Sequence, residues 1–253
     1  MCGIVGYVGT PGQSKPALGV VIDALRRMEY RGYDSAGIAL LDGSGGMAVE
    51  KKAGKLDNLV ATVESAGLEN YPATTGIGHT RWATHGRPTD INAHPHVDQL
   101  GKIAVVHNGI IENFAPLRAE LEAQGVEFTS ETDTETVTHL LHAEYYGEGP
   151  NAGNFTASVM AVINRLEGAF TLVIAHADHP DMLMACRRST PLVIGVGEHQ
   201  MFLGSDVAAF IEHTREAVEL GQDNVVTITA DGYTITDFEG NPVAGRPFPI
   251  DWA

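Results

Sequence analysis

The chain has 253 residues, enough for one large domain or two small ones, and 43% of them are hydrophobic, as in an ordinary globular protein. Its 32 acidic and 16 basic residues give a formal net charge of −16. This charge argues against nucleic acid or an anionic membrane surface as a partner, because both repel a negative protein. Two cysteines cannot form a disulfide framework, and the first residues lack the features of a signal peptide. We therefore expect a cytoplasmic protein.

Short runs rich in β-branched residues predict strands near both ends of the chain. In chain order the predicted strands are Ile4–Val8, Ala36–Leu41, Ile103–His107, Phe170–Ala175, Leu192–Val196, Val225–Thr229 and Tyr233–Thr236. The last two flank a short turn that contains Gly232, which predicts a hairpin.

Apolar residues at helical spacing predict four helices between these strands. Their apolar faces span Leu18–Met28, Phe114–Leu121, Val137–Leu141 and Phe155–Leu166. Thr132 and Glu135 resemble a capping box at the start of the third helix. Three helices bunch together in mid-chain and strands bunch after them, which favours an α+β layered domain over a parallel βαβ array.

The last part of the chain carries Pro242, Pro247 and Pro249 and shows no clear period. Such a segment is typical of a linker. We therefore predict one domain over residues 1–240, followed at residues 241–253 by the start of a linker.

Cys2 becomes the first residue of the chain if Met1 is removed, and it is then a candidate nucleophile. Its own α-amine would have a pKa of about 8, close to the pKa of about 8.5 of a cysteine thiol. One residue would therefore supply both nucleophile and base. The plain alternative is that a small residue at position 2 only permits the trimming of Met1. A lipid-anchored cysteine is disfavoured because no signal peptide precedes it.

A thiolate that attacks an amide needs donors for the developing oxyanion. An apolar run from Ala104 leads into Asn108 and Gly109. The side-chain amide of Asn108 and the backbone N–H of Gly109 could point at one oxygen, and glycine permits close approach. The alternative is an ordinary Asn-Gly turn.

Two further segments carry side chains that suit a charged ligand. Residues 78–86 bring Arg81, Trp82, Thr84 and His85 together after a short strand, and Arg81 is a natural clamp for a carboxylate. Asp133 lies in an acidic helix start, where it could accept hydrogen bonds from an ammonium group. The alternatives are a surface loop with one buried Trp and a favourable placement of acids at a helix N-terminus.

Close histidine pairs are the remaining candidates for a metal site. They are His94 with His96, His139 with His142, and His176 with His179. None forms an HExxH motif or has a cysteine or acidic partner at ligand spacing. We predict no functional metal.

Several blocks together resemble the class II, N-terminal-nucleophile glutamine amidotransferases. They are Cys2–Gly6, Arg81–Gly86, Asn92–Pro95, His107–Asn113 and Ser130–Glu135. The run Glu29–Gly37 narrows the resemblance to the isomerising glutamine–fructose-6-phosphate aminotransferase branch of that family. The resemblance covers essentially the whole chain. It implies a four-layer αββα sandwich, with two antiparallel sheets between helices.

The resemblance also implies a role for each matching residue. Cys2 attacks the side-chain amide of L-glutamine and forms a γ-glutamyl thioester, which water then hydrolyses. Asn108 and Gly109 form the oxyanion hole, Arg81 binds the α-carboxylate of the substrate, and Asp133 binds its α-ammonium group. The other implied site residues either lie beside the nucleophile or belong to the substrate pocket: Arg31, Gly32, Trp82, Thr84, His85 and His94.

The same family implies no cofactor for this chemistry. It implies a C-terminal isomerase half that uses the ammonia on fructose 6-phosphate, and a homodimer for the longer protein. No segment here resembles that half. A chain that keeps Met1 would have an amide in place of the required amine, so we expect it to be nearly inactive. Two alternatives are a module that binds glutamine without turnover and a glutaminase domain that serves another acceptor.

Overall fold

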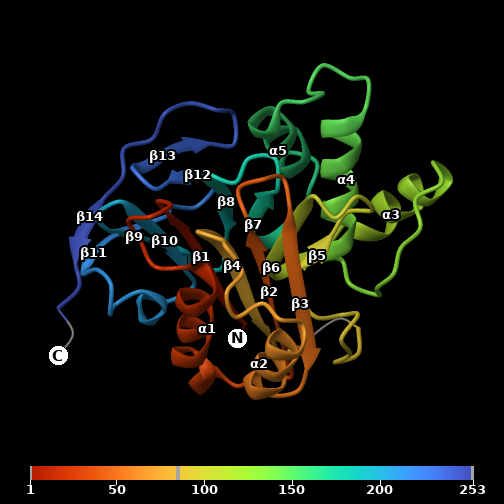
Figure 1. Cartoon of the computed structure of the whole chain (residues 1–253). Coiled ribbons are helices and arrows are strands. Elements are labelled where there is room, and N and C mark those ends of the chain that lie inside the picture. Colours follow the sequence, from red (N-terminus) through yellow and green to blue (C-terminus); the bar gives the residue numbers. More distant parts are fainter. Residues whose placement is uncertain (1, 84–85, 252–253) are drawn as a thin grey trace.

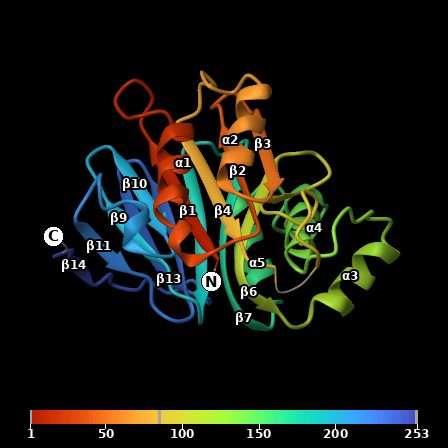
Figure 2. The ribbon, with the colours of Figure 1, turned by 90° about the horizontal axis from the view of Figure 1, so that it is seen from below.

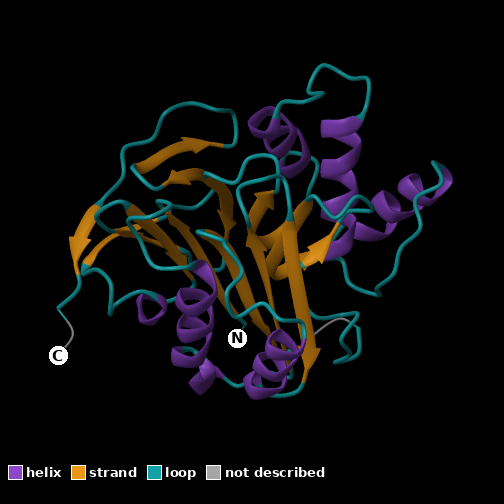
Figure 3. Ribbon diagram, viewed as in Figure 1, coloured by secondary structure: helices purple, strands orange, loops and turns teal. Residues whose placement is uncertain are grey.

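The computed structural model describes residues 2–83 and 86–251. Its strands form two antiparallel sheets that pack face to face, with helices on both outer faces (Figure 1, Figure 3). This arrangement confirms the predicted four-layer α+β sandwich.

The larger sheet has eight strands within the described residues. In spatial order these are β14 (Pro247–Pro249), β11 (Glu216–Glu219), β9 (Val193–Val196), β10 (Gln200–Gly204), β1 (Gly3–Gly9), β4 (Thr75–Arg81), β2 (Ser35–Leu41) and β3 (Met47–Ala53). The antiparallel pairing sets Gly3 opposite Thr80, so the start of β1 lies beside the end of β4.

The smaller sheet has six strands among the described residues. In spatial order these are β13 (Gly232–Asp237), β12 (Asn224–Thr229), β8 (Met182–Arg188), β7 (Gly168–His176), β6 (Ile103–Ile111) and β5 (His96–Val97). The strands β12 and β13 form the predicted hairpin.

Two groups of helices cover the outer faces of the sandwich. The larger sheet packs against α1 (Ala17–Arg27) and α2 (Leu56–Ser65), and the smaller sheet against α3 (Phe114–Ala123), α4 (Thr134–Tyr146) and α5 (Phe155–Ile163). Figure 2 shows the two groups on opposite sides of the sheets. Two short 3-10 helices, η1 (Glu29–Arg31) and η2 (Val207–Ala209), complete the list.

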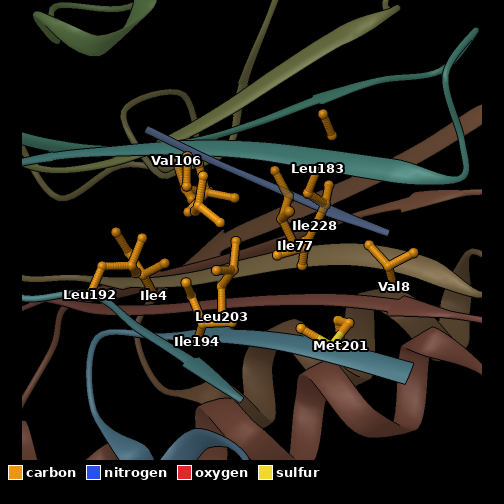
Figure 4. Close-up of a cluster of buried hydrophobic side chains, with 14 of the residues drawn as sticks. Ile4, Val8, Ile77, Val106, Leu183, Leu192, Ile194, Met201, Leu203 and Ile228 are labelled. Atoms are coloured by element: carbon orange, nitrogen blue, oxygen red, sulfur yellow. The ribbon is translucent and has the colours of Figure 1, made fainter. Parts of the chain in front are cut away.

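The central core fills the space between the two sheets. Ile4 and Ile77 of the larger sheet face Val106 and Leu183 of the smaller one (Figure 4). Every residue of β1 is buried, because helix α1 covers the other side of that sheet. A strand that is buried on both faces has a continuous run of apolar residues in the sequence. Such runs were enough to predict several of these strands.

The structure excludes one alternative interpretation and corrects one local prediction. Asn108 and Gly109 form no turn, because both lie inside β6 and pair with Thr171 and Phe170. Thr132 and Glu135 form no capping box. The hydroxyl of Thr132 is 2.8 Å from a ring nitrogen of His96, and Glu135 accepts hydrogen bonds from the backbone N–H groups of residues 129 and 130.

The segment after residue 240 is more ordered than its composition suggested. Strand β14 pairs with β11. Ile250 is buried in the apolar cluster between the larger sheet and its covering helices. Proline fits there because an edge strand leaves one side of its backbone unpaired. The predicted domain boundary at residue 240 stays a prediction, but the chain up to Ile250 packs on the sandwich.

Candidate active site

Cys2 lies directly before β1, at the end of the sandwich where β4 finishes. Its Sγ accepts a hydrogen bond from the backbone N–H of Trp82 at 3.2 Å. Burial raises the pKa of the Cys2 thiol, and the Trp82 N–H and the positive charge of Arg81 oppose this shift in part. The thiol is therefore protonated at neutral pH, and it needs a base before it can attack as a thiolate.

A cavity of about 250 Å³ opens beside Cys2. It is smaller than the cavities that hold drug-sized ligands, so its size suits a molecule such as an amino acid. Its lining comes from both sheets and from the start of α4: Cys2, Arg81, Trp82, His94, His107, Asn108, Gly109, Ile110, Asp133, Thr134 and Thr190. The structure thus brings seven of the predicted site residues to one cavity.

Asn108 and Gly109 line the cavity, and Asn108 contacts the residue that carries the nucleophile. The Asn108 amide donates from Nδ2 to the carbonyl oxygen of Cys2 at 2.9 Å, and its Oδ1 lies 3.1 Å from Nε2 of His79. Gly109 has φ 111°, and a Cβ there would overlap the carbonyl oxygen of Ala169. Only glycine fits this position without a shift of the backbone.

Opposite charges line the same cavity. Arg81 is the last residue of β4 and is 5% exposed. Burial lowers the pKa of its guanidinium, which nevertheless stays protonated at neutral pH. Asp133 precedes α4, and its Oδ2 accepts the backbone N–H of Ile111 at 2.8 Å. Its Oδ1 lies 4.0 Å from Nδ1 of His107 and keeps acceptor capacity for a ligand.

Comparison with known proteins identifies the family. A sequence model described as "Glutamine amidotransferase domain" matches residues 79–212. The chain belongs to this family.

Curated relatives narrow the similarity. The chain is 66% identical to the glutamine–fructose-6-phosphate aminotransferase [isomerizing] of Mycolicibacterium smegmatis, and it covers 41% of that protein. It is 58% identical to the protein of the same name from Corynebacterium glutamicum and covers 40% of it. All of the chain is matched in both comparisons, so it spans about two fifths of these relatives.

Solved structures support the fold. The glutamine phosphoribosylpyrophosphate amidotransferase from B. subtilis, complexed with ADP and GMP, superposes with a TM-score of 0.76. That match has 24% identity and covers 95% of this chain and 50% of the other. A glutamine aminotransferase class-II domain protein from Silicibacter pomeroyi matches with a TM-score of 0.59, 19% identity and 94% coverage of this chain. At these identities the similarity concerns the fold alone.

Two residues that the family resemblance assigns to the site lie beside the cavity, outside its lining. Arg31 forms an ion pair with Asp206 at 2.9 Å and donates to the hydroxyl of Ser205. That hydroxyl accepts the backbone N–H of Ile4, so Arg31 supports the start of β1. Gly32 has φ 72°, and a Cβ there would approach the ring of Trp82 to 3.8 Å.

The segment after β4 forms one rim of the cavity. Trp82 is 53% exposed, which is at odds with a surface loop closed around one buried Trp. The next residue, Ala83, donates its backbone N–H to the carboxylate of Asp34 at 2.7 Å. Thr84 and His85, predicted to line the pocket, lie outside the described residues, as does Met1.

Four buried histidines cluster around His94 beside the site, and two of them, His94 and His107, line the cavity. His79, His94, His96 and His107 are each no more than 4% exposed, and the rings of His79 and His94 stack at 4.2 Å. Burial lowers the pKa of all four rings, to about 3 for His79, so they are neutral at physiological pH. Within residues 2–83 and 86–251, no group of three His, Cys, Asp or Glu side chains is placed to hold a metal ion.

Four lining residues were not predicted as site residues. His107 and Ile110 lie inside a sequence block that carried the resemblance, so their position was available but no role was. Thr134 follows Asp133, and its hydroxyl oxygen is 2.9 Å from Nδ1 of His107. Thr190 follows β8 in an ordinary polar loop, and no sequence signal marked it.

In the described part of the chain, no helix is long and apolar enough to cross a membrane.

Proposed function

We propose that this chain is a glutaminase that hydrolyses L-glutamine to glutamate and ammonia through a γ-glutamyl thioester on Cys2. One observation carries the proposal: a cysteine thiol, an aimed side-chain amide, a buried guanidinium and a buried carboxylate line one cavity of amino-acid size. Membership in the glutamine amidotransferase family supports this choice of substrate.

The charges in the cavity match the two ends of an α-amino acid. Arg81 binds the α-carboxylate of glutamine, because a guanidinium can donate two parallel hydrogen bonds to a carboxylate. Oδ1 of Asp133, which has only a weak contact with the Thr134 hydroxyl, accepts a hydrogen bond from the α-ammonium group. Bound in this way, the side chain of glutamine extends towards Cys2. Trp82 covers the substrate from the rim, and Thr84, His85 and His94 complete its surroundings.

The reaction begins when the α-amine of Cys2, freed by removal of Met1, takes the proton of the thiol. Sγ then attacks the side-chain amide carbon of glutamine. Nδ2 of Asn108 and the backbone N–H of Gly109 stabilise the oxyanion. The Cys2 ammonium returns its proton to the amide nitrogen, the C–N bond breaks, ammonia leaves, and a thioester remains. Water, activated by the same amine, cleaves the thioester and releases glutamate. Arg31 and Gly32 keep the nucleophile in place.

The relatives are much longer than this chain, which supports a role for it as one part of a larger protein. They carry more than half of their residues beyond the matched part. We infer that the ammonia passes to a C-terminal isomerase half, which converts fructose 6-phosphate to glucosamine 6-phosphate in a cytoplasmic homodimer. The start of the connection to that half is then expected within residues 241–253, after Ile250, which still packs on the sandwich. The chain by itself should release free ammonia and form no glucosamine 6-phosphate.

The test uses protein whose mass shows that Met1 is absent. Incubation with L-glutamine should release glutamate and ammonia in equal amounts, and Cys2→Ala should abolish the release without unfolding the protein. Cys186→Ala is the matched control, because Cys186 is buried, does not line the cavity and should leave turnover unchanged. Glutamine that binds in a calorimeter but is not hydrolysed would instead identify a binding module. Full turnover with Met1 on every molecule would contradict the role of the amine.

A further inference from the structure

His79 contacts Asn108 from the side opposite the nucleophile. It lies in the middle of β4, paired with Ile4 of β1 and Gly37 of β2, and is fully buried. Like Ile77 two residues earlier, its side chain faces the smaller sheet, because alternate residues of a strand share a face. Its Nε2 lies 2.9 Å from the carbonyl oxygen of His107 and 3.1 Å from Oδ1 of Asn108.

These two contacts determine where the proton of the ring lies. A carbonyl oxygen only accepts hydrogen bonds, so Nε2 of His79 must donate to His107 and must carry the proton. The ring is neutral, because burial lowers its pKa to about 3, and its Nδ1 therefore has no proton. In agreement, the buried Nδ1 has no hydrogen-bond partner among the described residues.

The proton on His79 in turn fixes the amide of Asn108. The atom of Asn108 that faces Nε2–H must be an acceptor, because two donors at 3.1 Å would repel each other. Oδ1 therefore faces His79, and Nδ2 faces Cys2. Nδ2 has two hydrogens; one binds the Cys2 carbonyl oxygen at 2.9 Å, and the other remains for the oxyanion. If the Asn108 amide were turned by about 180°, its partly negative Oδ1 would face the oxyanion and repel it.

We infer that His79 is a positioning residue for the reaction: its Nε2–H holds the Asn108 amide with the donating nitrogen directed at the reacting carbon. His79 touches neither the thiol nor the cavity. The strand pairing and the stacking on His94 keep the ring fixed before substrate arrives. This inference rests on the proposed glutaminase activity.

The test is a double-mutant cycle between His79→Leu and Asn108→Ala. Asn108→Ala should lower kcat by about 100- to 1000-fold, as expected for an oxyanion donor. His79→Leu should lower kcat by about 10- to 100-fold with KM changed less than about threefold, because only transition-state stabilisation is lost. In the Asn108→Ala background, His79→Leu should change kcat less than about threefold. His79→Gln, which retains an N–H donor, should recover most of the activity.

A control separates positioning from support of the fold. His96 is as buried as His79, but it binds Thr132 and not Asn108. His96→Leu should therefore have the same effect on kcat with and without Asn108. Equal effects of His79→Leu in the two backgrounds would overturn the inference. If His79→Leu does not fold, the imidazole ¹⁵N spectrum of the wild type decides: a proton on Nε2 supports the inference, and one on Nδ1 overturns it. Loss of the proposed function itself would appear separately, as wild-type protein without Cys2-dependent glutamate release.

Discussion

Two carboxylates near the start of α4 are both buried, yet the protein surrounds them differently. Glu135 is 2% exposed and Asp133 is 7% exposed. Oε1 of Glu135 accepts the backbone N–H of Ser130 at 2.6 Å. Oε2 accepts the backbone N–H of Thr129 at 3.0 Å and lies 2.8 Å from Nε2 of His139. Glu135 borders a second hollow but has no bonding capacity left for a ligand.

Among the described residues, Asp133 has only one strong hydrogen bond: its Oδ2 accepts the backbone N–H of Ile111. Its Oδ1 has a weak contact of 3.5 Å with the hydroxyl of Thr134, and Asp133 lines the cavity with Arg81 and Cys2. The two residues are therefore similar in burial and charge. They differ in how many hydrogen bonds their oxygens can still accept from a ligand. A buried carboxylate that keeps a free oxygen is a candidate for ligand binding, whereas a saturated one stabilises the fold.

Asp133→Asn should have the largest effect on function. Asparagine keeps an oxygen for the backbone N–H of Ile111 but removes the charge that the substrate ammonium requires. We expect kcat/KM for glutamine to fall by about 100- to 1000-fold, as when one partner of a buried charge pair is removed. The free energy of unfolding should change by less than about 1 kcal/mol. Steady-state kinetics and urea unfolding check the two parts.

The substrate offers a second control on Asp133. A glutamine analogue without the α-amino group should bind Asp133→Asn no worse than it binds the wild type. If the variant loses activity towards the analogue as strongly as towards glutamine, Asp133 does not bind the ammonium group.

Glu135→Gln should show the reverse pattern. Glutamine has nearly the same shape but only one acceptor oxygen, and it lacks the charge that strengthens the hydrogen bonds from residues 129 and 130. Hydrogen bonds to a charged group contribute about 1.5–3 kcal/mol, so the free energy of unfolding should fall by about 2 kcal/mol. KM for glutamine should change less than about threefold, because Glu135 does not line the substrate cavity. A rise in KM with unchanged stability would contradict the contrast between the two residues.

The sequence predicted one of these carboxylates better than the other. Asp133 was assigned to the substrate through the family resemblance, and the structure brings it to the cavity with Cys2, Arg81 and Asn108. Glu135 was interpreted as half of a capping box because its spacing from Thr132 fits that motif. The motif fails here because Thr132 bonds to His96, which lies in β5, 36 residues earlier in the sequence. Local spacing cannot reveal such a competing partner.

The same limit applies to the rest of the molecule. Helix α1 and the buried strands were predictable because their burial depends on a periodic or continuous apolar pattern. Strand β14 was not, since its pairing with β11 rather than its composition orders it. Thr190 and the role of His79 were missed for the same reason: each depends on a contact between distant segments that only the folded chain brings together.

The pH dependence of stability gives the smallest and most specific test of the contrast. Burial alone would raise the pKa of Glu135, but hydrogen bonds from His139, Ser130 and Thr129 outweigh it and lower the pKa to about 2, from an ordinary value of 4.5. A carboxylate with a depressed folded-state pKa stabilises the protein above its unfolded-state pKa, and this contribution is lost as pH falls towards the folded-state value. The stability difference between the wild type and Glu135→Gln should therefore be full near pH 6.5 and smaller by about 1 kcal/mol near pH 3.5. Urea unfolding at the two pH values measures it, and a difference that grows on acidification would show that the Glu135 carboxylate is not the stabilising form.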